Sequence, residues 1–332
     1  MTELIITGKI LGEGKFGVVK EGFLQGIPIA CKEIAFSDSD DEKIFMNEIK
    51  IQHNLKHENI VKFLDWYIEK NSYGIMILEL MCLNLYELMY VQNIFWDELT
   101  QTRIIKEVAA GLAYLHGKNI LHRDIKPENI LLNGQHTAKI SDFGFSAQTT
   151  DGKIFGKIKG TIPYMAPELL KAYLNKMDFT YSKKTDIYAF GITCTEIIRR
   201  REPYEYESFS NVELLIDISN GLRDTLPVDA PPILAEITTN CVQQNPSDRK
   251  KINLIAKTLS IHYKQALIQS KNNKEHEKVD SPNQQQLPLN DRGTKLFSGK
   301  AHFWNNQNEK QLRSNVVCNH THTDWEITPK LT

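Results

Sequence analysis

The stretch Ile120-Leu121-His122-Arg123-Asp124-Ile125-Lys126-Pro127-Glu128-Asn129-Ile130-Leu131 is the most informative part of this chain, and Asp142-Phe143-Gly144 follows thirteen residues after Asn129. Together the two segments supply two carboxylates, a lysine and an asparagine at short, ordered spacings. A carboxylate such as Asp124 can accept a proton from a hydroxyl group, and a lysine such as Lys126 can neutralise a phosphate. Asn and Asp offer the oxygen ligands that Mg²⁺ prefers. The combination suits phosphoryl transfer, which depends on positioning and charge neutralisation.

A second segment, Gly12-Glu13-Gly14-Lys15-Phe16-Gly17, precedes Val18-Val19 near the start of the chain. Its glycine spacing alone is weak evidence, because dinucleotide-binding folds use the same spacing. Here the pattern continues as a strand and no βαβ unit surrounds it, so we expect a hairpin that lies over phosphate groups. Glycine lets the backbone approach phosphate oxygens without an intervening Cβ, and Phe16 at the tip would shield them from water. A plain hairpin turn is the alternative.

The ordered series of motifs resembles the catalytic core of eukaryotic protein kinases over about residues 4–265. The resemblance implies an α+β, bilobal fold, with a small β-rich N-lobe (4–79) that carries one regulatory helix, a hinge (80–85) and a larger α-helical C-lobe (86–265). It implies transfer of the γ-phosphate of ATP to Ser/Thr hydroxyls of protein substrates in intracellular signalling. The implied cofactors are ATP and Mg²⁺, with Mn²⁺ as a substitute.

In this family Asp124 would be the catalytic base and Lys126 would neutralise the γ-phosphate, while Asn129 and Asp142 would coordinate Mg²⁺. The lysine that holds the α- and β-phosphates would be Lys32, fifteen residues after Gly17 in Ala30-Cys31-Lys32.

The glutamate that pairs with this lysine would be Glu48, sixteen residues further on, with Glu42 as the runner-up. An exposed, solubilising role is the alternative for both Lys32 and Glu48.

The resemblance implies nucleotide contacts from Gly12, Glu13, Gly14, Lys15, Phe16, Gly17, Val19, Ala30, Lys32, Glu79, Met81, Asn84 and Leu131. Leu78 would be the gatekeeper, the segment from Glu79 to Met81 would offer backbone groups to adenine, and Asn84 would lie near the ribose. Val19, Ala30 and Leu131 would sandwich the adenine ring, although each is equally compatible with an ordinary core position.

Four further residues are implied to make specific contacts within the C-lobe. Thr161 would contact the catalytic base and its lysine. Glu168 would form a bidentate pair with Arg249, and Asp186 would anchor the backbone of the catalytic loop.

Lys126 and Thr161 are typical of the serine/threonine branch, so tyrosine or dual specificity is disfavoured. The segment from Gly221 to Pro227 resembles the tyrosine-kinase-like group of serine/threonine kinases, although Val242 replaces a common tryptophan. A nucleotide-binding scaffold of the pseudokinase type is the alternative function. It is opposed by the presence of the catalytic lysine, base and metal ligands, Lys32, Asp124, Asn129 and Asp142.

Two positions bear on regulation. Gln52, four residues after Glu48, stands where the family places an apolar side chain, so it would weaken packing or require a hydrogen-bond partner. Arg123 is the family's usual partner of a phosphorylated activation-loop residue, but residues 151–160 contain no Ser, Thr or Tyr. We therefore predict autophosphorylation at Thr149 or Thr150. An activating partner or a trans-autophosphorylating homodimer would serve such a chain.

Composition adds exclusions. The formal net charge of −1 gives no basic field for nucleic acid. The longest apolar stretch, residues 73–85, is too short to span a membrane, so we expect no membrane insertion. Five scattered cysteines are typical of reduced thiols in the cytoplasm. Residues 266–332 are rich in Asn, Gln, Lys and His, and we expect a polar, disordered tail in which Cys318, His320 and His322 are a weak candidate for metal binding.

The periodicity predicts strands within 4–36, at 60–67 and at 73–80. It predicts helices at 42–55, 96–116, 185–200, 208–220, 230–244 and 251–266.

Overall fold

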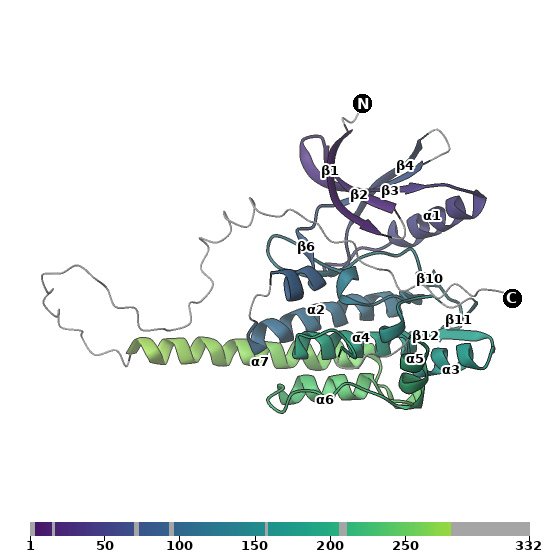
Figure 1. The fold of residues 1–332 in the computed structure, drawn as a ribbon. Helices are drawn as coiled ribbons and strands as arrows, with labels where there is room; N and C mark the ends of the chain where they lie inside the picture. Colours follow the sequence, from purple (N-terminus) through teal and green to yellow (C-terminus); the bar gives the residue numbers. More distant parts are fainter. Residues whose placement is uncertain are drawn as a thin grey trace, which may run out of the picture. The chain divides into compact units, whose positions relative to one another are not determined.

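The computed structural model describes residues 4–14, 17–69, 73–92, 96–156, 159–205 and 211–279. Nearly all of them belong to one unit, Met1–Ile268, and of the second unit, Gln269–Thr332, only residues 269–279 are described. Within the first unit a β-sheet part precedes a helical part, with the sheet drawn above the helices in Figure 1. This is the α+β, two-lobed arrangement that the sequence predicts.

The N-lobe is built on an antiparallel five-stranded sheet of order β1-β2-β3-β5-β4. Its strands are β1 (Leu4–Gly14), β2 (Gly17–Leu24), β3 (Ile27–Ala35), β4 (Phe63–Glu69) and β5 (Tyr73–Glu79). Because side chains alternate along a strand, Ile75 and Ile77 of β5 pack on one face and Met76 packs on the other. The Met76 face is covered by Phe45 and Ile49 of helix α1 (Ser39–Gln52).

Helix α1 begins earlier than the predicted residue 42. The carboxylate of Asp38 accepts hydrogen bonds from the backbone N–H groups of Asp40 (2.7 Å) and Asp41 (3.1 Å), so Asp38 is the N-cap. Acidic side chains in the first turn also favour the positive end of the helix dipole. The helix ends at Gln52, before the predicted end at 55.

The C-lobe contains six α-helices in the described residues: α2 (Glu98–Gly117), α3 (Pro167–Leu174), α4 (Lys183–Arg199), α5 (Asn211–Asn220), α6 (Pro232–Cys241) and α7 (Ile252–Val279). Helix α4 is buried continuously from Thr185 to Ile198 and is the central helix. Helix α7 runs past its predicted end at 266, into the region that we expect to be a tail. The rest of that tail, and with it Cys318, His320 and His322, lies outside the described residues.

Short strands and turns fix the segments between these helices. Strand β7 (Ile120–Leu121) pairs with β10 (Ala147–Gln148), and β6 (Leu83–Asn84), β8 (Ile130–Leu132) and β9 (Ala138–Ile140) form a second small sheet. A π-helical turn, η1, covers Glu87–Val91, and 3-10 turns lie at η2 (Pro127–Asn129), η3 (Ile162–Tyr164) and η4 (Pro246–Asp248). The strands before His122, after Asn129 and before Asp142 therefore place the two motifs beside each other.

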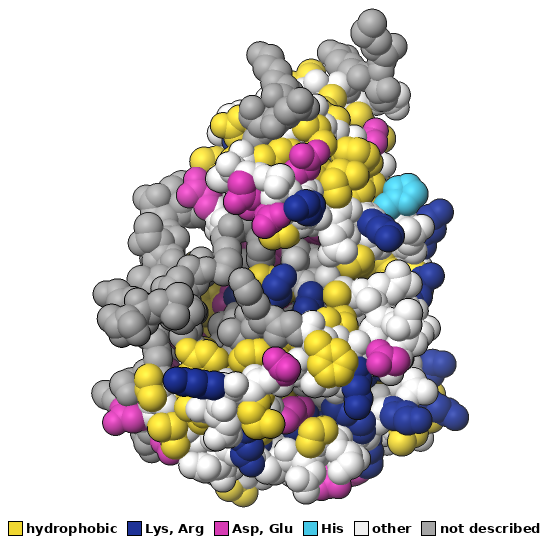
Figure 2. Space-filling model, turned by 90° about the vertical axis from the view of Figure 1, so that its right-hand side faces the viewer, with side chains coloured by type: hydrophobic (Ala, Val, Ile, Leu, Met, Phe, Trp, Pro, Cys, Tyr) yellow, Lys and Arg dark blue, Asp and Glu magenta, His cyan; other side chains and the backbone are white. Residues whose placement is uncertain are grey.

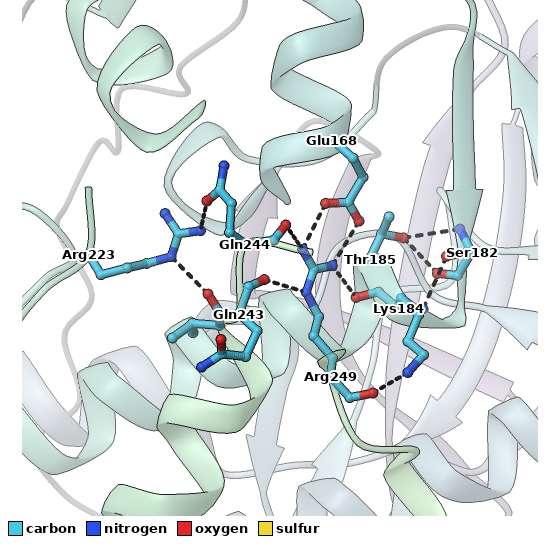
Figure 3. Close-up of polar contacts among 9 residues, drawn as sticks. Glu168, Ser182, Lys184, Thr185, Arg223, Gln243, Gln244 and Arg249 are labelled. Carbon is cyan, nitrogen blue, oxygen red and sulfur yellow. Dashed lines mark hydrogen bonds and ion pairs between the residues drawn. The ribbon is translucent and has the colours of Figure 1, made fainter. Parts of the chain in front are cut away.

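A further antiparallel pair, β11 (Lys153–Gly156) with β12 (Phe179–Ser182), and helix α3 were not predicted. Glu168 at the start of α3 forms the expected bidentate pair with Arg249, at 2.7 and 2.8 Å (Figure 3).

On the face drawn in Figure 2, charged side chains of both signs lie among apolar and uncharged ones, and Lys and Arg side chains gather along one edge and over the lower part. Among the described helices, none is both long enough and apolar enough to span a bilayer.

Candidate active site

The catalytic loop, which runs from His122 to Asn129, is held at its start by Asp186 of helix α4. This carboxylate is 1% exposed and accepts hydrogen bonds from the backbone N–H groups of His122 (3.0 Å) and Arg123 (2.9 Å). The Nε2 atom of His116 lies 2.9 Å from it. Burial by itself would raise the pKa of Asp186, but His116 and the two backbone donors lower it overall, so the carboxylate is charged. The anchoring role predicted for Asp186 is therefore borne out by its contacts, and it holds Arg123 in a left-handed conformation (φ 68°).

Asp124 lies in a ring of short contacts. The Asn129 side-chain amide donates at 2.8 Å to both the Asp124 backbone oxygen and its Oδ2 atom, and the Thr161 hydroxyl donates to Oδ1 at 3.1 Å. The Lys126 ammonium is 3.9 Å from Oδ2. Burial raises the pKa of Asp124 above its ordinary value, although Lys126 opposes the shift. A held, partly desolvated carboxylate with a raised pKa is suited to accept a proton.

Lys32 joins three parts of the fold. Its ammonium lies 2.8 Å from Glu48 Oε1 on α1 and 2.9 Å from Asp142 Oδ1, which are 16 and 110 residues away in sequence. Burial would remove the charge, but the two carboxylates more than compensate and raise the pKa of Lys32. The structure thus brings Lys32 and Glu48 together as predicted, whereas the runner-up, Glu42, is exposed.

Asp142 and Phe143 are neighbours in the sequence, but their side chains contact different residues, Lys32 and His122 respectively. Asp142 has φ 57°, and Phe143 is fully buried with its ring 5.2 Å from the His122 ring in an edge-on arrangement. Burial of the Asp142 carboxyl opposes its charge, but the Lys32 ammonium lowers its pKa overall. Gln52 is 1% exposed and donates from Nε2 to the Val61 carbonyl at 3.3 Å, which is the hydrogen-bond partner that its buried amide requires.

The donor set fits a divalent cation that also binds phosphate. Because the Asn129 amide nitrogen faces Asp124, its amide oxygen is directed away from Asp124. Asp142 adds a charged carboxylate whose Oδ1 atom accepts from Lys32 Nζ at 2.9 Å and from the Gly144 N–H at 3.4 Å. Within the described part of the chain no three His, Cys, Asp or Glu side chains form a metal cage. Two oxygen ligands completed by phosphate and water are how Mg²⁺ is commonly bound.

The glycine-rich segment forms the hairpin of β1 and β2, with Gly14 opposite Gly17, Glu13 opposite Val18 and Gly12 opposite Val19. A Cβ added at Gly12 or Gly14 would meet nothing within 4 Å, so the backbone there is open to a ligand. Gly17 is constrained differently: it has φ +124°, and a Cβ would lie 1.9 Å from the carbonyl oxygen of Glu33 on β3. Lys15 and Phe16 lie outside the described residues.

The hinge is more constrained than the sequence suggests. Glu79 turns its carboxylate to Lys139 (2.7 and 2.8 Å) and to the backbone N–H of Lys62 (2.6 Å), while its own N–H donates to the Lys62 carbonyl. A contact from Glu79 to adenine would therefore fall to its carbonyl oxygen. The Cys82 N–H donates to the Leu132 carbonyl. The backbone N–H groups of Glu79 and Cys82, which flank the predicted Met81 in the sequence, are therefore both engaged.

Asn84 has a structural role that was not predicted. Its Oδ1 atom accepts from the Glu87 N–H at 2.8 Å, and its own N–H donates to Glu87 Oε2 at 3.0 Å, so reciprocal hydrogen bonds join β6 to the first residue of η1. The predicted position near a ribose stays a prediction. Of the three apolar residues, Ala30 is buried, whereas Val19 and Leu131 retain partly exposed surface.

The two predicted phosphorylation sites differ in access. Thr149 is buried, and its hydroxyl lies 3.0 Å from Asp151 Oδ1 and 2.8 Å from the Lys153 carbonyl oxygen. Thr150 is exposed. Modification of Thr149 would require this turn to open, so Thr150 is the accessible hydroxyl of the pair.

Sequence reasoning missed two residues that connect the site. Asn47 donates from Nδ2 to the Ser146 carbonyl at 3.3 Å and thereby links α1 to the segment after Asp142. Tyr181 on β12 contacts the backbone of Lys159, ahead of Thr161. The only signal for Asn47 was its place beside Glu48, and Tyr181 belongs to no motif.

The model of the protein kinase domain family matches residues 5–260. The chain therefore belongs to the protein kinase family.

The chain is also similar to several curated proteins. The chain is 31% identical over 268 residues to "Probable serine/threonine-protein kinase gdt2" of Dictyostelium discoideum, a match that covers 77% of this chain and 16% of that protein. It is 35% identical over 204 residues to an Aurora kinase of Yarrowia lipolytica, covering 60% and 53% respectively. It is 31% identical over 264 residues to "Dual specificity protein kinase shkA" of D. discoideum, covering 77% and 49%. The chain thus spans about half or less of the length of these relatives.

Proposed function

We propose that the chain is a serine/threonine protein kinase that transfers the γ-phosphate of ATP to protein hydroxyls. The observation that carries the proposal is the convergence of two groups of side chains. Lys32 from β3 and Glu48 from α1 meet Asp142, while Asn129 and Lys126 surround Asp124 on the neighbouring loop. Both sets contain the kinds of ionisable side chain that phosphoryl transfer uses.

The residues have distinct roles in this proposal. Asp124 accepts the proton of the substrate hydroxyl as the hydroxyl oxygen bonds to the γ-phosphorus and the bond to the β-phosphate oxygen breaks. The raised pKa of Asp124 makes it a better proton acceptor than an ordinary carboxylate. Lys126 lies 3.9 Å from the Asp124 carboxylate, where its charge can neutralise the transferred group.

The nucleotide would lie under the β1–β2 hairpin, with Lys32 on its α- and β-phosphates. Asn129 and Asp142 would hold Mg²⁺, which supplies charge neutralisation on the phosphate oxygens, and Mn²⁺ would serve as a substitute. The nucleotide-contacting residues would be Gly12, Glu13, Gly14, Lys15, Phe16, Gly17, Val19, Ala30, Glu79, Met81, Asn84 and Leu131.

We also propose finer assignments. The kinase domain would extend over 4–265, with the hinge at 80–85, and the chain would act in the cytoplasm. Membership of the tyrosine-kinase-like group is proposed from the segment between Gly221 and Pro227. An activating partner or a trans-autophosphorylating homodimer would favour the active position of α1, in which the buried amide of Gln52 must keep its hydrogen bond to Val61.

Phosphoamino-acid analysis tests the specificity directly. The chain is incubated with labelled ATP, Mg²⁺ and a degenerate peptide library, and the labelled products are hydrolysed and separated. We expect phosphoserine and phosphothreonine, and no label with the Asp124→Asn variant. Phosphotyrosine alone would refute serine/threonine specificity, and a mixture of all three would indicate dual specificity, as the name of the shkA relative states for that protein.

A further inference from the structure

Tyr181 of strand β12 holds the backbone that leads into Thr161. Its hydroxyl accepts a hydrogen bond from the Lys159 N–H at 2.5 Å and donates one to the Lys159 carbonyl at 3.0 Å. One side chain therefore satisfies both backbone groups of a residue 22 positions away. The two contacts fix the position of Lys159 more tightly than either would alone.

The Tyr181 ring is itself immobilised. The residue is 1% exposed and packs in a cluster with Leu121 and Leu169, against which Ile154 and Phe179 also lie. Ile154 is also its partner in the β11–β12 ladder. Burial raises the pKa of Tyr181, so the hydroxyl keeps its proton and can donate and accept at once.

Arg123 lies against the same ring, with its guanidinium carbon 5.4 Å from the ring centroid. Its Nε atom is buried and has no hydrogen-bond partner among the described residues. Burial lowers the pKa of Arg123, but a guanidinium stays charged, so the ring face of Tyr181 provides the charge with a favourable contact. Residues 151–160 contain no Ser, Thr or Tyr that could be phosphorylated to pair with it.

The next two residues continue the contact with the catalytic loop. Gly160 has φ +111°, and a Cβ there would come within 2.9 Å of the Arg123 carbonyl oxygen, so only glycine permits this approach. Thr161 then donates to the Asp124 carboxylate at 3.1 Å. Lys159 thus contacts Tyr181, and Gly160 lies against Arg123. Thr161 binds Asp124.

We propose that Tyr181 is a positioning residue for phosphoryl transfer, whose hydroxyl and ring hold residues 159–161 against the catalytic loop without a phosphate group in residues 151–160. This inference rests on the proposed function for its catalytic consequence. Its structural part, the restraint on Lys159, can be tested whether or not the chain is active.

Hydrogen–deuterium exchange tests the restraint. In Tyr181→Phe the ring remains and only the hydroxyl is lost, so we expect exchange of the Lys159 amide to rise about 5- to 30-fold, as loss of about one or two kcal/mol of local stability implies. Tyr114→Phe is the matched control, because the Tyr114 hydroxyl accepts a backbone hydrogen bond from Lys56 at 2.8 Å on another part of the fold. The control should leave exchange at Lys159 unchanged. Unchanged exchange at Lys159 in Tyr181→Phe would overturn the proposal.

Steady-state kinetics test the consequence. Because the Lys32 side of the site is untouched, Tyr181→Phe should lower kcat severalfold and leave KM for ATP within about twofold of wild type. A kcat equal to that of wild type would refute the positioning role. If the wild-type chain itself transfers no phosphate, the proposed function fails, and the exchange measurement still decides whether Tyr181 restrains Lys159.

Discussion

Removing the charge of Glu168 should destabilise the C-lobe strongly, because it leaves the buried guanidinium of Arg249 without a counter-charge. Arg249 is 1% exposed, and each of its five N–H donors has an acceptor (Figure 3). Two donate to Glu168 at 2.7 and 2.8 Å, and the others reach the backbone oxygens of Gln243 (2.9 Å), Lys184 (2.8 Å) and Gln244 (3.4 Å). Glu168 is the only carboxylate among these acceptors.

The magnitude follows from the cost of leaving a buried charge unpaired. Breaking such a pair by removing one partner typically costs about 3–5 kcal/mol. For a domain of this size, each kcal/mol lowers Tm by about 2–4 °C. Glu168→Gln should therefore lower Tm by about 6 to 20 °C. The underlying loss of about 3–5 kcal/mol is a large part of the about 5–15 kcal/mol that stabilises a typical domain.

Thermal unfolding followed by circular dichroism measures the effect, with Glu236→Gln as the matched control. Glu236 pairs with Lys250 at 3.0 Å, but the two side chains are 63% and 46% exposed, so its loss should cost less than about 1 kcal/mol. The double variant Glu168→Gln/Arg249→Met should be more stable than the sum of the single changes predicts, because the stranded charge is gone. If Glu168→Gln shifts Tm no more than the control does, the reasoning is refuted.

Three further results follow from the site. Lys126→Met should raise the pKa of Asp124 further, because it removes the cation that opposes the effect of burial, so the acid limb of the kcat/KM profile should move to higher pH; a limb that stays in place counts against Asp124 as the base. Gln52→Leu should increase basal activity, because an apolar side chain replaces a buried amide whose Nε2 atom donates to the Val61 carbonyl at 3.3 Å. An assay without added partner that finds no increase removes this explanation. Chelation of divalent cations should abolish transfer, and added Mg²⁺ should restore it. In Asp142→Asn the Mg²⁺ concentration that gives the half-maximal rate should rise about tenfold or more, and an unchanged concentration would contradict the metal assignment.

The sequence predicts the site better than the fold around it. Asp124, Asn129 and Asp142 belong to short motifs. The structure joins Asn129 to Asp124 through the side-chain amide and to Ser141, beside Asp142, through the backbone. The Lys32–Glu48 pair spans only 16 residues, and the resemblance to protein kinases implied it. These contacts depend on local segments that carry strong signals.

What could not be predicted depends on contacts between distant segments. The β11–β12 pair joins Ile154 to Tyr181, and neither segment has a clear alternating pattern. Helix α1 begins at Ser39 because of the Asp38 cap, whereas the predicted start followed the apolar periodicity. The contacts of the Glu79 carboxylate depend on the Lys62 backbone and the Lys139 side chain, which no local rule places beside the hinge.

The measurement that tests the central claim most directly compares ATP binding and phosphate transfer in Asp124→Asn. Asp124 contacts the attacking group and not the adenine or ribose in this account, so the Kd for Mg²⁺–ATP should stay within about twofold of wild type while single-turnover transfer to a peptide falls by about 10²- to 10⁴-fold. Transfer at the wild-type rate by the folded variant would contradict the claim that this carboxylate, held by Asn129 and Thr161, accepts the substrate proton.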